Sequence, residues 1–389
     1  MMTLVQISIY LRELGASIQQ LGLFFTTSLI FPLLLRIFGG WLSDVIGRLK
    51  ALTIGSVAGM LAFVAYTLAP SWQTALLAPA LLAVTVAFIF PSYKAYIADQ
   101  TSENMRGRIF GLAEAIITIS WILGPPIGGL IAHNLGYRWM FAIAALCFAI
   151  ATILFFGLYR TQTDEPDEIT VKPSFSTMQV SFKRMFLLML SGGLVTWILI
   201  VDGVRDVAFK LSFDLMPVYL SEIGLLTKQQ IGFLDGLFGV AFTLTAFLAG
   251  ILVDRTSERV GITVGLVVMI FSRLVFAIAL TFWGFAFSWV LLGIGGGFLD
   301  PAASSLIARG VPRSVRGLTY GLVATSLSII SLPAPWIGSQ MWNLISPRAP
   351  FLLTVILASL IIVPAWSRLV LPDERWEGVD ADLSMVRQS

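Results

Sequence analysis

Apolar segments long enough to cross a lipid bilayer recur along almost the whole chain of 389 residues. About 20 apolar residues in a helix span the hydrocarbon core, because each residue advances the helix by about 1.5 Å. Only 12% of the residues are charged, against about 25% in soluble domains, which argues against a water-soluble protein. We therefore predict an all-α integral membrane protein with eleven full spans and an apolar stub at residues 1–11. The predicted spans are residues 18–42, 50–69, 74–98, 108–132, 138–158, 194–220, 230–253, 262–282, 285–309, 318–342 and 349–370.

The distribution of lysine and arginine predicts the orientation in the cell membrane, because cytoplasmic loops carry an excess of both. One set of loops and tails carries sixteen of them and the opposite set carries four. The rich set includes the loops at 43–50 and 254–261, which are therefore predicted to be cytoplasmic. The sixteen are Arg48, Lys50, Arg106, Arg108, Arg160, Lys172, Lys183, Arg184, Arg255, Arg259, Arg309, Arg313, Arg316, Arg368, Arg375 and Arg387, and the four are Arg12, Arg138, Lys228 and Arg348.

The chain also contains an internal repeat. Residues 210 positions apart match in type and in order along both halves, and chance does not produce such a colinear series. We predict two six-helix bundles in the same orientation, at 1–158 and 186–370, joined by a cytoplasmic linker at 159–185 and followed by a cytoplasmic tail at 371–389. The matched pairs include Gly40 and Gly250, Asp44 and Asp254, Pro91 and Pro301, Arg106 and Arg316, Gly111 and Gly321, Pro125 and Pro335, and Gly128 and Gly338.

The repeat predicts that the first helix is incomplete. A full span precedes YLSEIG at 219–224, whereas only nine residues precede the matching YLRELG at 10–15. Met1 then aligns with Lys210, a position near the middle of the bilayer. We expect about 15–25 residues of the first helix to be missing from the sequence.

Two polar motifs interrupt the apolar pattern at equivalent positions, GWLSDVIGRLK at 40–50 and GILVDRTSERV at 250–260. The first motif resembles the signature of the major facilitator superfamily, and the resemblance covers essentially the whole chain. It implies two bundles related by a pseudo-twofold axis and a gate, including Asp44 and Arg48, that locks them together on the cytoplasmic side when the outside is open. Arg48 can pair with an acid at a neighbouring helix end, and Asp99 is the candidate for this acid. The alternative is that these charges only anchor the loops at the membrane surface. The residues of this gating motif are Gly40, Asp44, Gly47, Arg48, Asp99, Gly250, Asp254 and Arg255.

The predicted span at 108–132 carries a second motif, which resembles the fifth-helix motif of the antiporter branches of the superfamily. Small residues let two helices approach closely, and proline removes a backbone hydrogen bond. Helix packing without any bearing on the direction of transport is the alternative reading. The motif residues are Gly111, Ser120, Gly124, Pro125, Gly128 and Gly129, and Ser120 is the one departure from the pattern.

Ionisable residues inside the spans are the candidates for a proton or substrate site, because charges facing lipid are costly. Four of the five in 194–220 are spaced by four residues, and Asp206–Lys210 and Asp202–Arg205 are spaced to pair along a helix. Either an acid of this group or Asp300 takes up the coupling proton, or the group is a structural network. The candidate site residues are Asp202, Arg205, Asp206, Lys210, Asp300, Lys94 and Arg36; Asp214, Asp235, Glu114 and Arg273 also lie within the spans.

The sequence carries no motif for a metal, a cofactor or a catalytic nucleophile, and its single cysteine and single histidine lack partners. We expect no enzymatic activity, no cofactor and no nucleic-acid partner. The leading prediction is a monomeric secondary transporter in the lipid bilayer that moves a small organic solute by alternating access, through proton-coupled export or antiport. A proton symporter or facilitator for sugars or organic acids is the alternative, and a transport-inactive sensor or scaffold is a remote one. Lys94 replaces the arginine typical of drug exporters, which weakens a drug-efflux assignment.

Overall fold

The computed structural model describes residues 6–161, 193–311 and 327–370, apart from the side chains of residues 36–45 and 254, and every element it describes there is helical. The first half contains a short helix and five long ones, one of them preceded by a single turn. They are α1 (Ile7–Glu13), α2 (Ile18–Ile46), α3 (Arg48–Leu68), α4 (Trp72–Ala75), α5 (Leu77–Gln100), α6 (Glu103–Asn134) and α7 (Tyr137–Thr161).

The second half repeats this order with more interruptions. Its elements are α9 (Leu194–Ser212), η1 (Phe213–Leu215), α10 (Met216–Glu222), α11 (Lys228–Arg255), α12 (Glu258–Ile278), α13 (Phe282–Gly310), α15 (Ala334–Leu344), α16 (Ala349–Leu360) and α17 (Ile362–Arg368). Within the described ranges, nine helical segments are long and apolar enough to cross a membrane. These nine match nine of the predicted spans. Of the other two, the span at 194–220 is α9, η1 and α10, and most of the span at 318–342 lies outside the described residues.

Proline accounts for two of the interruptions. Pro217 has no N–H to donate to the carbonyl of Phe213, and the helix changes to a 3-10 turn at η1 just before it. Pro364 likewise removes the bond to Leu360, the residue at which α16 ends. Other prolines, such as Pro32, lie inside continuous helices, so the sequence alone does not locate the breaks.

The repeat extends to side-chain detail. Ser17 and Gln20 form a capping box at the start of α2, and Thr227 and Gln230 form the equivalent one at the start of α11. Aromatic clusters repeat in the same way. Tyr10 and Tyr66 each lie 4.9 Å from the ring of Phe141, and their counterparts Tyr219 and Phe276 lie 5.1 and 4.6 Å from Phe351.

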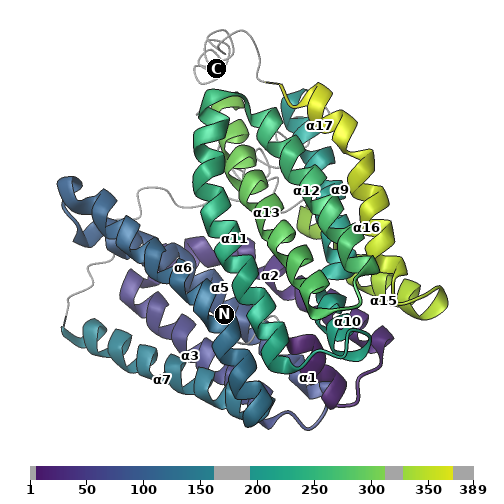
Figure 1. Ribbon diagram of the computed structural model, residues 1–389. Coiled ribbons are helices and arrows are strands. Elements are labelled where there is room, and N and C mark those ends of the chain that lie inside the picture. The colour runs from purple at the N-terminus through teal and green to yellow at the C-terminus, as the bar shows by residue number, and fades with distance from the viewer. Residues whose placement is uncertain (1–5, 162–192, 312–326, 371–389) are drawn as a thin grey trace, which may run out of the picture.

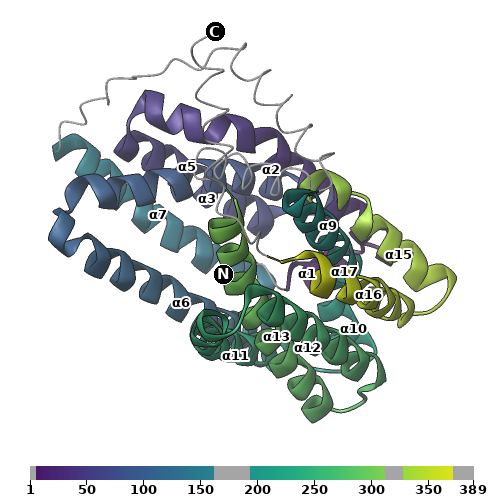
Figure 2. The same ribbon diagram turned by 90° about the horizontal axis from the view of Figure 1, so that it is seen from above.

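The helices form two groups that meet at one end of the molecule (Figures 1 and 2). In the first group α3 packs against α5 and α7, and in the second α13 packs against α11 and α12. The groups touch through α6 and α11, α2 and α15, and α1 and α10. We call the end that carries α1 and α10 the closed end and the opposite end the open end. The boundaries of the two predicted bundles stay predictions, because residues 162–192 between them lie outside the described part.

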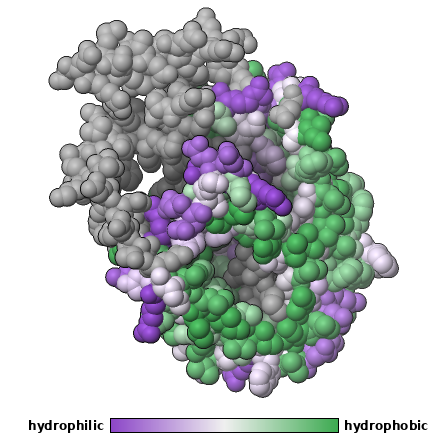
Figure 3. Space-filling view, turned by 90° about the vertical axis from the view of Figure 1, so that its left-hand side faces the viewer, coloured by the Kyte–Doolittle hydropathy of each residue, from purple (hydrophilic) through white to green (hydrophobic). Residues whose placement is uncertain are grey.

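Apolar side chains cover much of the face shown in Figure 3, and hydrophilic side chains gather at its edges and in one patch near the middle of the view. Large apolar side chains lie on the outer surface of the molecule, such as Phe247 with 72% and Ile153 with 69% of their surface exposed. Contact of these side chains with water would cost free energy. They fit a surface that faces lipid.

Candidate functional site

Glycine residues bring α6 and α11 into contact near the closed end. A Cβ atom at Gly129 would lie 2.6 Å from the carbonyl oxygen of Lys228, and one at Gly232 would lie 2.5 Å from that of Pro125. Only glycine permits backbones to approach this closely. At Gly111 and Gly250, farther along the same two helices, nothing lies within 4 Å of such a Cβ. The two helices therefore touch near the closed end and separate toward the open end.

The second contact between the halves joins α2 and α15. A Cβ at Gly22 would collide with the side chain of Ser339. The backbone N–H of Trp336 donates to Thr26 Oγ1 at 3.2 Å, and Gln19 donates to Gln340 Oε1 at 3.3 Å. This contact also belongs to the closed end, because Gln19 and Gly22 lie in the first turns of α2.

Two ion pairs cross between the halves at the closed end, and we call their four residues the closed-end latch. Arg12 Nε lies 2.6 Å from Glu222 Oε1, and Lys228 Nζ lies 2.6 Å from Glu13 Oε1. The ammonium group of Lys228 also lies 4.3 Å from the ring centre of Tyr137. The latch residues come from the matched segments YLRELG and YLSEIG and from the first residue of α11, so the repeat places them together.

Beneath these contacts lies a cavity of about 500 Å³ between the two groups of helices. Residues of both halves line it, because α1, α2 and α6 contribute from the first half and α9, η1, α10, α11 and α13 from the second. Seven of its lining residues are aromatic and three are aspartates, and none of the described lining residues is Lys, Arg, Asn or Gln. The lining comprises Ser8, Phe25, Thr118, Trp121, Pro125, Phe209, Phe213, Asp214, Met216, Pro217, Asp235, Phe238, Gly239, Phe242, Thr243, Trp289, Leu292 and Asp300.

Asp235 is the most deeply buried acid of this cavity, with 8% of its surface exposed. Trp289 Nε1 donates to Asp235 Oδ1 at 3.0 Å. The other carboxylate oxygen has no hydrogen-bond partner among the described residues. Buried polar atoms are normally satisfied, so this oxygen is available to a proton or a ligand in the cavity. Asp300 is exposed and Asp214 is half-buried, so the three acids lie at different depths.

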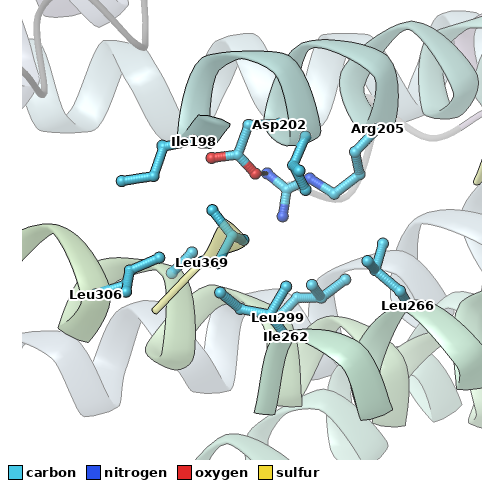
Figure 4. Close-up of a pocket in the computed structure, with 10 residues that line it drawn as sticks. Ile198, Asp202, Arg205, Ile262, Leu266, Leu299, Leu306 and Leu369 are labelled. Carbon is cyan, nitrogen blue, oxygen red and sulfur yellow. Dashed lines mark ion pairs between the residues drawn. The ribbon is translucent and has the colours of Figure 1, made fainter. Parts of the chain in front are cut away.

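The four charged residues of α9 do not line this cavity, although Arg205 and Asp202 interact electrostatically with Asp300, and Lys210 with Asp214. Arg205 Nη2 lies 3.2 Å from Asp202 Oδ1, and this pair faces Leu266, Leu299 and other apolar side chains of α12 and α13 (Figure 4). Lys210 Nζ lies 2.8 Å from Asp206 Oδ2 and donates to Ser331 Oγ at 2.8 Å. Both pairs expected from the helical spacing are present. None of these four residues lines the central cavity, so their assignment to a proton or substrate site stays a prediction.

The first half contributes one exposed pair. Lys94 Nζ lies 3.8 Å from Glu114 Oε1, and both side chains are more than half exposed. The remaining candidate, Arg36, lies outside the described side chains, as do Gly40, Asp44 and Asp254 of the gating motif.

The expected pairing of Arg48 with Asp99 is present and has a counterpart in the second half. Arg48 Nε lies 3.6 Å from Asp99 Oδ2. At the same offset of 210, Arg309 Nη1 lies 2.8 Å from Glu258 Oε1, and Ser305 Oγ donates to the same oxygen at 3.0 Å. The charges are reversed between the halves. In the described state neither pair crosses between the halves, so their role as a gate stays a prediction. Gly47 has a φ of 89°, which favours glycine, and Gly250 and Arg255 belong to the last turns of α11.

The antiporter-like motif divides into two parts. Gly124, Pro125, Gly128 and Gly129 are buried, at the end of α6 that packs against α11. Ser120 is exposed and donates to the carbonyl of Ile116 at 2.9 Å. This supports the packing interpretation for the buried part, and any effect of the motif on the direction of transport is untested.

Two features of the site were missed in the sequence. Asp235 lies within a predicted span but is not among the predicted site residues. The glycines of α11 were not noticed, although Gly232 and Gly236 show the four-residue spacing of a close helix contact.

Comparisons with known proteins agree on the family. A sequence model described as Major Facilitator Superfamily matches residues 1–226 and 204–385. The multidrug resistance protein MdtG of Dickeya zeae is 24% identical over 92% of this chain and 87% of its own length. The quinolone resistance protein NorA of Staphylococcus aureus is 21% identical over 91% of this chain and 89% of its own length.

Solved structures share the fold. A D-xylose-proton symporter superposes with a TM-score of 0.71 over 95% of this chain and 93% of its own, at 16% identity. A peptide transporter in complex with sulfate superposes with a TM-score of 0.72 over 92% of this chain and 89% of its own, at 13% identity. Since the superfamily model matches both halves and the fold is shared over more than nine-tenths of the length, the chain belongs to the Major Facilitator Superfamily and is a multi-pass secondary transporter of small organic solutes.

Proposed function

We propose that the protein exports lipophilic organic cations from the cell in exchange for protons. The observation that carries the proposal is the central cavity, where three aspartates lie among seven aromatic rings without a lining lysine or arginine among the described residues. Aromatic faces attract cations and bind apolar surface. A carboxylate in a site of low dielectric binds either a proton or an organic cation. Both ions compete for the same groups, and this competition is the basis of exchange.

The orientation follows from the basic residues. We propose that the open end, the linker and the tail face the cytoplasm of the cell membrane, because the loops at that end carry most of the lysines and arginines. In the described state the cavity is then closed to the outside by the latch and by the contacts of α6 with α11 and of α2 with α15. The relatives named as multidrug and quinolone resistance proteins support export.

The proposed cycle changes no covalent bond of the substrate, and the only bonds made and broken are the O–H bonds of the aspartates that take up and release the proton. It therefore needs no catalytic residue and no cofactor, and one chain supplies both halves of the cavity, so we propose a monomer in the lipid bilayer. Uptake of a sugar by proton symport is the alternative, and the described cavity lining lacks the side-chain amides that would bind several hydroxyl groups.

The test uses proteoliposomes with an acidic lumen and a pH-sensitive dye. A fluorescent organic cation should dissipate the pH gradient in the wild type. Asp235→Asn and Asp300→Asn should each reduce this exchange by roughly tenfold to a hundredfold, because each removes a charge-assisted contact of about 1.5–3 kcal/mol.

Asp202→Asn is the comparison variant, since it removes an intramembrane acid that does not line the cavity; because the charge of Asp202 also acts on Asp300, it is compared with Asp235→Asn. Sugars or organic anions that dissipate the gradient would contradict the proposal. So would an exchange that depends on Asp202 and not on Asp235 or Asp300.

A further inference from the structure

Arg273 is a buried cation that the proposed exchange does not use. It lies on α12 with 1% of its surface exposed and is among the largest fully buried side chains of the protein. Its side chain reaches toward the first helices of the second half. Arg273 Nη1 contacts the sulfur of Met216, and the guanidinium carbon lies 5.8 Å from the ring centre of Phe209.

Among the described residues, the guanidinium group of Arg273 has no anionic partner. Arg273 Nε and Nη2 have no hydrogen-bond partner within the described part of the chain, and no carboxylate there forms an ion pair with Arg273. A thioether sulfur is only a weak acceptor. Arginine is rarely buried without an anion or hydrogen-bond acceptors beside it, because its five N–H donors lose their bonds to water on burial. Arg205 and Arg309 of the same half are more exposed than Arg273, and both have carboxylate partners.

A single layer of side chains separates Arg273 from the cavity. Met216 and Phe209 contact the guanidinium group on one side and line the cavity on the other. Methionine is unbranched and has three rotatable bonds, so it can turn aside without a change of the backbone. Movement of Met216 would connect the unpaired donors to the cavity.

We propose that Arg273 binds the carboxylate group of a zwitterionic substrate while the cavity aspartates hold its ammonium group. This inference rests on the proposed function and narrows its substrate class from lipophilic cations to amphipathic molecules that carry both charges. The planar guanidinium fork matches a carboxylate in two parallel hydrogen bonds. Asp235 on α11 and Asp300 on α13 lie on other walls than Met216, so one molecule can meet both charges.

The experiment compares a rhodamine methyl ester, which is a cation, with the corresponding free acid, which is a zwitterion of the same ring system. Export of each is followed by fluorescence in proteoliposomes, and kcat/KM of the acid is divided by that of the ester. Arg273→Met should lower this ratio about tenfold or more, because it removes a paired charge–charge contact. Arg273→Lys should lower it less, since the charge stays but the fork is lost.

Arg259→Met is the matched control, because it removes an arginine of the same helix that lies over Trp366; it should leave the ratio unchanged. Met216→Ile tests the access route. A β-branched side chain is stiff at χ1, so this variant should lower the ratio while Arg273 is intact.

Thermal unfolding in detergent gives a readout without transport. The free acid should raise the melting temperature of the wild type and not that of Arg273→Met. Without ligand, Arg273→Met should melt no lower than the wild type, because it removes an uncompensated buried charge. A lower melting temperature would show that Arg273 is a structural partner and would overturn the inference.

Equal losses for acid and ester in Arg273→Met would also overturn it, because the arginine would then serve the protein's own acids. Stimulation of ester export by free acetate to the level of the acid would show that the site takes a separate anion, which contradicts a zwitterionic substrate. If neither probe moves in the wild type, the proposed function fails, and the ligand-dependent melting shift still tests Arg273.

Discussion

At the residue scale, partners on one helix were predictable from their spacing. Among partners on different helices, only Arg48 and Asp99 were expected to pair, and they do. Asp206 and Lys210 are four residues apart, so the helical repeat alone brings them together, and the structure confirms this pair. Asp235 and Trp289 are 54 residues apart, and their hydrogen bond depends on how α11 packs against α13. Tertiary packing therefore decides which acid lines the cavity, and one sequence without its fold does not reveal it.

The two ion pairs related by the repeat should differ in strength. Glu258 is 2% exposed at the start of α12, where the helix dipole favours an acid, and Arg309 lies in the last turn of α13, where it favours a base. Arg48 is the first residue of α3 and Asp99 lies in the last turn of α5, so the helix dipole disfavours the charge of each. The side chain of Asp99 is also 53% exposed. We expect Glu258→Gln to cost about 1–3 kcal/mol and Asp99→Asn less than about 1 kcal/mol.

Thermal unfolding in detergent measures both variants against the wild type. Glu258→Gln should melt clearly lower, and Asp99→Asn should melt close to the wild type. The reverse order would show that the helix dipoles do not decide between the two pairs.

At the element scale, hydrophobicity predicted the helices and missed their interruptions. Nine described segments agree with predicted spans, because the cost of burying unpaired backbone groups in lipid enforces helices there. The predicted span at 194–220 is a helix, a 3-10 turn and a second helix. Pro217 breaks it and Pro32 does not break α2, so the presence of a proline does not by itself locate a break.

Packing of α6 against α11 should be sensitive to a single methyl group. Gly232→Ala places a Cβ 2.5 Å from the carbonyl oxygen of Pro125 and 3.0 Å from the Cα of Gly129. Both are backbone atoms, so the helices must separate. Overpacking of this kind costs about 1–3 kcal/mol, and we expect a lower melting temperature and slower transport.

Gly250→Ala is the control on the same helix, because nothing lies within 4 Å of its added Cβ. If both variants melt at the same temperature, the close approach of α6 and α11 does not contribute to stability.

At the scale of the whole molecule, the sequence predicted the two halves but not the state in which they meet. Alternating access requires the same residues to serve a state closed at either end. The repeat is therefore compatible with both states. The described contacts between the halves lie at the closed end, in the latch and in the contacts of α6 with α11 and of α2 with α15.

Breaking the latch should favour opening of this end. Each of its ion pairs is partly exposed and worth about 0.2–1 kcal/mol, so Arg12→Gln combined with Glu13→Gln should raise the population open to the outside about two- to thirtyfold. The measurement is labelling of Ser8→Cys, which lines the cavity, by a membrane-impermeant maleimide in a Cys147→Ser background.

Arg12→Glu alone should increase labelling of Ser8→Cys, because it breaks the pair with Glu222. Adding Glu222→Arg re-forms this pair with its charges exchanged and should lower the labelling again. Labelling that stays at the wild-type level after both glutamine substitutions would show that the latch does not hold the closed end.

The reversed charges of the two repeated ion pairs also bear on self-association. A twofold axis between identical units brings each residue opposite its own copy, so a charged patch on such an axis repels itself. Position 48 carries a base and its equivalent 258 an acid, while position 99 carries an acid and its equivalent 309 a base. If equivalent positions met on the pseudo-twofold axis in a state closed at the open end, 48 with 258 and 99 with 309 would join opposite charges, whereas a half meeting its own copy there would bring like charges together. Such a contact would favour the two different halves over two copies of one half, as a heterodimer is favoured over its homodimers.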